Sequence, residues 1–371
     1  MVTGWVWDER YMWHDTGMGG GPLPAQGWIE PMPHIEAPDA KRRFANLVAA
    51  SGLGGRLAPI PARVATVEEL ERVHTTAHVV RIRDEAAAGR GDAGDGSSPF
   101  GPESYEIARL AAGGVIAAVE AVVAGTVDNA YALVRPPGHH AFAESGWGFC
   151  IFNNVAVAAR HARRALGIER VAIVDLDVHH GNGAQAIFCA DPTVLAVSIH
   201  QDGAYPPGSG TLDEVGEGPG AGTTLNVPLP PGSGQGAYEA ALDRVVLPAL
   251  DRFRPDLILV ACGFDANGYD PMARQMLHSD AYRALTQRLL DAAATHCDGR
   301  LVMAHEGGYS PWYVPFCGLA VVETLAGERT DVADPYVEAL RGYGQDLRDH
   351  QRAAVEAAAA LVAGVPSHAA R

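Results

Sequence analysis

Short apolar runs alternate with helical patterns through the chain after residue 130, and this alternation restricts the fold more than any other feature. Short apolar runs are typical of strands buried on both faces, and the helical patterns between them are typical of crossover connections. The sequence therefore predicts an α/β fold with a mostly parallel sheet between helices, in a single domain over residues 1–371. The predicted strands are residues 130–134, 171–175, 194–199, 257–262 and 301–304.

Helical patterns and loops complete this outline. Thr66 and Glu69 have the spacing of a capping box at a helix start. Residues 1–38, rich in Trp, Gly and Pro, predict a short strand and then a long irregular loop that shapes the rim of the site. Residues 89–98 predict an exposed polar loop, and residues 346–371 contain a last helix packed on the outside. The other predicted helices are residues 39–50, 102–125, 154–166, 183–189, 279–295 and 312–325.

Composition excludes several classes of protein. Apolar residues make up 47% and charged residues 19%, which is enough apolar material for a sizeable core. The net charge of −16 argues against binding to nucleic acid or to an anionic membrane. The sequence contains no apolar run of about 18 residues, so it predicts no membrane span. No signal peptide is visible. Five dispersed cysteines without a CxxC motif fit a reducing compartment, so we expect a cytoplasmic protein and leave open whether it forms a homo-oligomer.

Polar residues of catalytic type follow each of the five predicted strands. Asp175, Asp177 and His179 occupy alternate positions at one strand end, and alternate residues of a strand point to one face. Ligands bind beyond the carboxyl ends of the strands in open α/β sheets, so Asp265 from another strand end can join them. Asp177, His179 and Asp265 would leave an open position, as in catalytic zinc sites. Ligation without sulfur also admits iron(II) or cobalt, and Asp265 alone could be a turn residue.

Two adjacent histidines, His139 and His140, follow another predicted strand. Beside a metal-bound water, one imidazole can take a proton and return it to a leaving amine, while the other stays charged or orients the site. Asp175 and Asn182 are candidate partners for the ring N–H groups. Tyr309 follows two glycines and could donate to the oxyanion formed when water attacks a carbonyl, although alone it could be an ordinary loop aromatic.

The motifs RPPGHH, WGFCIFNN, DLDVHHGNG, GFDA and EGGY occur in this order. As a set they closely resemble the histone deacetylase superfamily, above all its class II branch and the bacterial homologues that include acetylpolyamine amidohydrolases. The similarity runs from about residue 104 to residue 327, with a weaker match at HIEAPDAKRR. The resemblance implies the arginase–deacetylase fold, with a mostly parallel eight-stranded sheet sandwiched between helices. It also implies zinc-dependent hydrolysis of N-acetyl-lysine or related acyl amides.

The resemblance also implies roles for particular residues of the reaction. His140 would act as general base and acid, with His139 as its electrostatic partner. Asp175 would hold His139, and Asn182 would face His140. Tyr309 would polarise the substrate carbonyl. The implied ligands of one zinc ion per chain are Asp177, His179 and Asp265.

Substrate binding and a second metal follow from the same resemblance. The carbonyl of Gly148 would accept the substrate amide N–H, and Phe149 and Tyr205 would wall a narrow tunnel. Pro137 would lie near the tunnel mouth and Met272 at its rim. A structural potassium ion would be held mostly by backbone carbonyls, those of Asp175, Asp177, His179, Ser198 and Ile199.

Three positions depart from other members of the superfamily. Asn182 replaces the Asp of class I members, and a neutral partner stabilises an imidazolium less, so the pKa of His140 should be lower than it would be beside Asp. Met272 stands where polyamine-selective members place a Glu, which removes an attraction for polyamines. The Tyr205-Pro206 pair lacks the second aromatic of many eukaryotic members, which would widen the tunnel.

Several functions stay open from the sequence. The substrate could be an acyl-amine peptide or small molecule: an acetyl-lysine protein, an acetylpolyamine, a longer acyl amide or an acylated secondary metabolite. A dimanganese ureohydrolase would need more carboxylate and histidine ligands than DLDVHHGNG and GFDAN offer. A non-catalytic acyl-amine binding protein would not need three ligands, two histidines and Tyr309 together.

Overall fold

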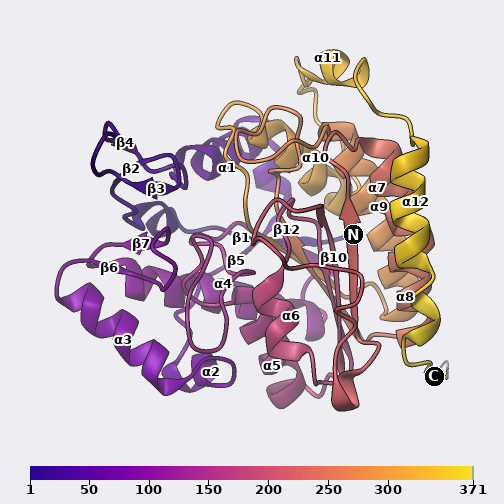
Figure 1. The fold of residues 1–371 in the computed structure, drawn as a ribbon, viewed down its shortest axis with the longest axis horizontal. Helices are drawn as coiled ribbons and strands as arrows, with labels where there is room; N and C mark the ends of the chain where they lie inside the picture. The colour runs from indigo at the N-terminus through magenta and orange to yellow at the C-terminus, as the bar shows by residue number, and fades with distance from the viewer. Residues whose placement is uncertain (370–371) are drawn as a thin grey trace.

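An eight-stranded parallel sheet forms the centre of the computed structural model, which describes residues 1–369 (Figure 1). Every strand pairing in this sheet is parallel, which confirms the predicted α/β class. In sheet order the strands are β11 (Thr224–Leu229), β10 (Val194–Gln201), β9 (Val171–Asp175), β12 (Leu257–Cys262), β13 (Leu301–His305), β8 (Asn129–Ala132), β1 (Thr3–Val6) and β5 (Ala58–Ile60).

Helices cover both faces of the sheet (Figure 1). Helices α3, α4 and α5 pack on one face, and α1, α7 to α10 and α12 pack on the other. The helices are α1 (Asp39–Ala50), α2 (Val67–Glu71), α3 (Thr76–Ala87), α4 (Ser104–Val123), α5 (Asn154–Ala165), α6 (Asn182–Phe188), α7 (Gln235–Ala241), α8 (Leu247–Phe253), α9 (Ser279–His296), α10 (Val314–Ala326), α11 (Val337–Arg341) and α12 (Asp349–Ala359).

The central strands are buried on both faces, as their apolar runs predict. In β9, Val171 and Ile173 pack toward α4 and α5, whereas Ala172 and Val174 pack into the opposite layer. Side chains of a strand alternate between faces, so each strand needs apolar residues at every position to fill both layers. The five predicted strands correspond to β8, β9, β10, β12 and β13.

Two segments are more ordered than the sequence predicted. Residues 1–38 contain, after β1, a 3-10 helix at Glu9–Trp13 and a three-stranded antiparallel sheet of β2 (Met18–Gly20), β3 (Leu23–Pro24) and β4 (Met32–Pro33). Residues 89–98 contain β6 (Gly91–Asp92), which pairs with β7 (Pro99–Phe100). Strands this short carry no alternation of apolar and polar residues, so their pairing leaves no pattern in the sequence.

Smaller expectations are confirmed. Thr66 Oγ1 accepts a hydrogen bond from the Glu69 amide at 3.1 Å, and Glu69 Oε2 accepts one from the Thr66 amide at 2.8 Å, forming the capping box of α2. The cysteines are free thiols. The predicted last helix is α12, followed by a 3-10 turn at Val362–Gly364, and residues 370–371 lie outside the described part. None of the helices in residues 1–369 is long and apolar enough to cross a membrane.

Candidate functional site

The loops after β8, β9, β12 and β13 meet at one edge of the sheet. These four strands are neighbours in the sheet and run in the same direction, so their carboxyl ends lie side by side. The histidine pair follows β8, the Asp-Leu-Asp-Val-His segment starts at the last residue of β9, Asp265 follows β12 and Tyr309 follows β13. The topology therefore brings together the residues that the sequence placed at separate strand ends.

Asp177, His179 and Asp265 form a compact, buried group. Their nearest ligand atoms all lie within 4.8 Å of one another. His179 Nδ1 lies 3.1 Å from Asp177 Oδ1 and 3.1 Å from Asp265 Oδ2. Asp265 Oδ2 is buried and has no hydrogen-bond donor among the described residues. Because buried carboxylates are costly without a compensating cation, this orphaned oxygen and the mixed nitrogen–oxygen donor set fit a divalent metal ion.

The electrostatics of this group point the same way. Burial, and then the charge of Asp177, raise the pKa of Asp265 to about 6. Burial opposes the charged form of His179, but the nearby carboxylates of Asp177 and Asp265 outweigh it and raise the pKa of His179 well above its usual range. Backbone amides fix the carboxylates, since Gly307 donates to Asp177 Oδ2 at 2.8 Å and Val178 donates to Asp265 Oδ1 at 2.9 Å. A bound cation would replace the proton on His179 and reverse these shifts.

The two adjacent histidines have different partners. His139 Nδ1 lies 2.9 Å from Asp175 Oδ2, and His140 Nδ1 lies 2.6 Å from Asn182 Oδ1. Burial lowers the pKa of His139, but the charges of Asp175 and Asp177 overcome it and raise the pKa to about 10. Burial, and then the charge of His139, lower the pKa of His140 well below its usual value. The pair therefore combines a cationic imidazole with a neutral one.

The neutral ring of His140 has a defined tautomer. The side-chain oxygen of Asn182 can only accept, so His140 Nδ1 carries the hydrogen and Nε2 is left as a proton acceptor. The two histidine rings are 3.9 Å apart between centroids, and the rings of His140 and His179 are 6.0 Å apart. A base of this kind next to a metal-ligand group can accept a proton from water.

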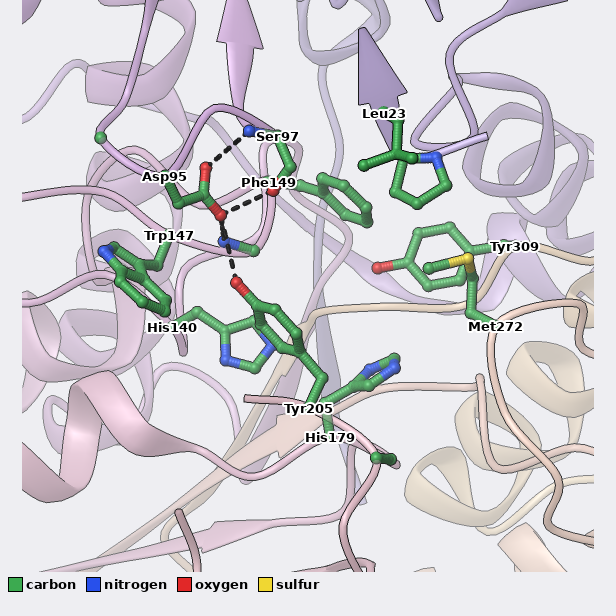
Figure 2. Close-up of a pocket in the computed structure, with 14 residues that line it drawn as sticks. Leu23, Asp95, Ser97, His140, Trp147, Phe149, His179, Tyr205, Met272 and Tyr309 are labelled. Carbon is green, nitrogen blue, oxygen red and sulfur yellow. Dashed lines mark hydrogen bonds between the residues drawn. The ribbon is translucent and has the colours of Figure 1, made fainter. Parts of the chain in front are cut away.

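A cavity of about 650 Å³ opens onto this group (Figure 2). Figure 2 shows His140, His179 and Tyr309 around one space, with the hydroxyl of Tyr309 pointing into it. The Tyr309 ring packs edge-on against Phe149 at 5.7 Å, and the Tyr205 ring packs edge-on against His140 at 5.0 Å. The structure thus brings the tyrosine, the neutral histidine and the metal-ligand group to a common cavity.

The wall of the cavity is mostly apolar. Phe149, Tyr205 and Met272 line it, as the resemblance implied, and Pro22 and Leu23 from the N-terminal sheet line it as well. Gly148 has φ +53°, and a Cβ there would collide with the His140 ring, so the close approach of this backbone requires glycine.

Three predicted site residues, Pro137, Ser198 and Ile199, are buried. Pro137 is buried and, within the described part of the chain, is not among the residues that line the cavity, contrary to the expected place near the mouth. The Gly138 amide next to it donates to Glu306 Oε2 at 2.6 Å, which ties this turn to the residue that follows β13. Ser198 lies opposite Asp175 in the pairing of β10 with β9, and Ile199 follows it, while the potassium ion stays a prediction.

Asp95 is a cavity residue that the sequence did not reveal. It lies in residues 89–98, which were expected to form an exposed loop. Its carboxylate accepts hydrogen bonds from the Gly148 amide at 2.8 Å, the Tyr205 hydroxyl at 3.1 Å and the Ser97 hydroxyl at 2.7 Å (Figure 2). Burial opposes its charge, but these bonds lower the pKa of Asp95 overall. The Asp-Gly-Ser-Ser sequence predicts a turn, but it does not reveal the contacts of Asp95 with Gly148 and Tyr205, which lie far away in the sequence.

Asp270 is a second residue that the sequence missed. Its Oδ2 accepts a hydrogen bond from the Tyr309 amide at 2.7 Å, and its Oδ1 accepts one from the Met272 amide at 2.9 Å. It therefore connects the turn that carries the tyrosine to the rim of the cavity. Burial, and then the charge of Asp265, raise its pKa to about 8.

Comparison with known proteins agrees with the geometry. The profile of the histone deacetylase domain matches residues 34–325. The chain is 50% identical to the histone deacetylase-like amidohydrolase of Pseudomonas aeruginosa, over 100% of this chain and 99% of that protein. It is 36% identical to a probable deacetylase of Archaeoglobus fulgidus, over 88% and 87% of the two chains. The solved HDA15 HD domain superposes with a TM-score of 0.84 at 34% identity, covering 98% of this chain and 96% of that one, consistent with the arginase–deacetylase fold. The chain belongs to the histone deacetylase family.

Proposed function

We propose that the protein is a zinc-dependent deacetylase that hydrolyses N-acyl amides, acetyl amides above all, of lysine-like amines to carboxylate and free amine. The observation that carries the proposal is the common cavity of three groups: the Asp177–His179–Asp265 group with its orphaned oxygen, the neutral His140 and the hydroxyl of Tyr309. The name of the Pseudomonas aeruginosa relative, histone deacetylase-like amidohydrolase, supports the same reaction.

Asp177, His179 and Asp265 would hold one zinc ion, which when bound supplies a Lewis acid for the acyl carbonyl and lowers the pKa of a water. His140 Nε2 takes a proton as water attacks the carbonyl carbon, and Asn182 keeps the ring in the required tautomer. Tyr309 donates a hydrogen bond to the carbonyl oxygen as negative charge develops on it.

The remaining residues complete the cycle. His140 returns its proton to the departing nitrogen, so that the C–N bond breaks, the new C–O bond stays, and carboxylate and amine are released. His139, held by Asp175, remains charged and keeps the pKa of His140 low. The carbonyl of Gly148 accepts the substrate amide N–H, and Phe149 and Tyr205 enclose the acyl-amine stem.

The cavity favours a neutral stem over a polycation. Asp95 is the single carboxylate among the described residues of the wall, and its oxygens already accept from Gly148, Tyr205 and Ser97. The rim offers Leu23 and Met272. We therefore place an acyl-lysine peptide or an apolar acyl-amine first, and an acetylpolyamine or an acylated secondary metabolite as an alternative with the same mechanism.

The proposal also includes a second metal ion, the domain organisation and the location of the protein. A structural potassium ion would be bound by the backbone carbonyls of Asp175, Asp177, His179, Ser198 and Ile199. Residues 1–371 would form one catalytic domain, with Pro22 and Leu23 at the rim. The five free cysteines support a reducing compartment, and we propose a cytoplasmic location.

Substitution of the two reacting side chains tests the proposal. We expect His140→Ala to lower turnover of an acetyl-lysine peptide by about 10²- to 10⁴-fold, because the general base is lost, and Tyr309→Phe by about 10²- to 10³-fold, because an oxyanion donor is lost. Both variants should keep the zinc content of the wild type. The exposed His350→Ala and Tyr343→Phe serve as controls with the same chemical change. Full activity in either active-site variant would refute the assigned roles, and absence of turnover in the wild type on a panel of acyl amides would favour a non-catalytic binding protein.

A further inference from the structure

Glu306 is a buried acid that the reaction does not use. It is the first residue after β13 and directly precedes Gly307, Gly308 and Tyr309. Its side chain is fully buried, and its Oε2 accepts hydrogen bonds from the backbone amides of Gly138 at 2.6 Å and His139 at 3.1 Å. The Glu306 carboxylate lies on the tyrosine turn, residues 306–309. It therefore holds the backbone of the histidine turn, residues 137–140, which carries both histidines.

The backbone of Glu306 is anchored as well, whereas its Oε1 is buried without a hydrogen-bond partner among the described residues. The Glu306 amide donates to the Cys262 carbonyl at 3.2 Å, which ties its backbone to the end of β12. The next residue, Gly307, donates to Asp177 Oδ2 at 2.8 Å. Glu306 thus spans the distance between the metal-ligand group and the histidine turn.

Asn153 Nδ2 and the Ala184 amide donate to the His139 carbonyl, so other groups hold the carbonyls of the histidine turn, whereas its amides depend on Glu306. Gly138 and His139 lie outside helices and strands, and both are buried, so their amides need acceptors inside the protein. Glu306 Oε2 is the acceptor of both. A shift of this turn would move His140 Nε2 relative to the Asp177–His179–Asp265 group and to Tyr309, where small displacements strongly reduce rates.

We propose that Glu306 is a positioning residue that sets where His139 and His140 stand relative to the metal-ligand group and to Tyr309. The proposal rests on the function proposed above, in which His140 is the general base. The property that matters is the length and accepting power of the side chain, which two backbone amides use. The competing explanation is its negative charge, which lies near the cationic His139.

Two variants separate these explanations. Glu306→Gln keeps the length and an accepting oxygen but removes the charge, whereas Glu306→Asp keeps the charge but withdraws the oxygens by one methylene. We expect kcat for an acetyl-lysine peptide to fall on the order of 10²-fold in Glu306→Asp, with KM and zinc content unchanged, because the base is misplaced. Glu306→Gln should keep most of the wild-type kcat. The reverse order, with Asp active and Gln inactive, or wild-type kcat in both, would overturn the proposal.

A second readout does not depend on turnover. Hydrogen exchange of the peptide that contains Gly138 and His139 should be faster in Glu306→Asp than in the wild type or Glu306→Gln, because the amides lose their acceptor. Equal exchange in all three proteins would overturn the positioning role. If the wild type hydrolyses no acyl amide, the proposed function fails while this comparison still decides the role of Glu306.

A matched control addresses stability. Glu323 on α10 is also a buried glutamate, and it pairs with Arg283 and accepts from Thr330 away from the cavity. We expect Glu323→Asp to lower thermal stability while kcat per folded molecule and exchange at Gly138 stay as in the wild type. A loss of kcat in this control as large as in Glu306→Asp would show that general destabilisation explains the effect.

Discussion

Asp95 illustrates how one side chain can shape the cavity without facing the reaction. Its carboxylate joins the Gly148 amide, the Tyr205 hydroxyl and Ser97, so the loop at residues 89–98, the glycine turn and the tyrosine form one wall. Hydrogen bonds to a buried or half-buried charge are stronger than neutral ones. This wall should therefore be rigid before a substrate binds.

Removal of Asp95 should affect binding more than chemistry. We expect Asp95→Ala to raise KM for an acetyl-lysine peptide roughly tenfold, because the loosened wall must then be ordered when the substrate binds, at a cost of about 0.5–1.5 kcal/mol per side chain. The value of kcat should change much less, because His140 and Tyr309 keep their own anchors. Steady-state kinetics test this, with Ser97→Ala as a control that removes a single donor. A loss of kcat at unchanged KM would contradict it.

Met272 gives a prediction on selectivity. Met272→Glu would place a charge on the otherwise apolar rim and should raise kcat/KM for an acetylated polyamine about threefold to fivefold relative to an acetyl-lysine peptide, as expected for one solvent-exposed ion pair. Met272→Gln has the same size without the charge and should leave the ratio unchanged. Competition between the two substrates measures the ratio. An equal change in both variants would show that size rather than charge controls entry.

At the level of elements, the turns after the strands must pass close to the carboxylates. Gly307 is the second residue after β13. A Cβ on it would collide with Asp265 Oδ2 and Asp177 Oδ2. Asp177 and Asp265 can therefore lie close together because the residue packed against both of them, Gly307, has no side chain. This is a demand of packing at the metal-ligand group, independent of any reaction.

Gly307→Ala should weaken metal binding although it changes no ligand. We expect the zinc affinity to fall about 10- to 100-fold, as for loss of groups that orient ligands. Gly55→Ala is the control, because a Cβ there meets open space. Competition with a chromophoric chelator measures both affinities. Wild-type affinity in Gly307→Ala would show that the ligands do not occupy the described positions.

The central elements were predictable and the peripheral ones were not. β9, β12 and β13 are apolar at nearly every position, and β10 is apolar over Val194–Val197, because both faces are covered. β11 was missed because it contains Asn226 and Pro228, which an edge strand tolerates. β5 has only three residues, and the helical stretch of α7 and α8 is interrupted by a π-helical turn at Leu242–Val246.

The site also contains residues that could be predicted from the sequence and residues that could not. Residues that follow strands or belong to motifs, such as Asp177, His140 and Tyr309, were found from the sequence. The roles of Asp95, Asp270 and Glu306 were not predicted, although Glu306 begins the EGGY motif, because each acts by accepting hydrogen bonds from backbone amides far away in the chain. A bond from a side chain to a distant backbone amide leaves no spacing or periodicity to read.

At the scale of the whole molecule, buried histidines control stability at low pH. Burial lowers the pKa of His14 and of His74 to about 3, so both stay neutral in the folded protein. The unfolded chain takes up these protons below pH 6.5, so it binds more protons than the folded state between pH 6.5 and 3. The free energy of unfolding must therefore fall as the pH decreases through this window.

His74→Gln measures one share of this effect. Urea unfolding across pH 6 to 4 should show a slope smaller than the wild-type slope by up to about 1.4 kcal/mol per pH unit, the value for one proton. An unchanged slope in His74→Gln would mean that His74 is protonated in the folded state.

The central claim is that one zinc ion at Asp177, His179 and Asp265 supports amide hydrolysis beside His140 and Tyr309. Metal-free protein titrated with zinc, with acetate release from an acetyl-lysine peptide recorded at each step, tests it most directly. The account predicts that activity rises from the background and saturates at one zinc per chain. No release of acetate at any zinc level would contradict it, and metal uptake that ends only at two manganese ions per chain would favour a ureohydrolase.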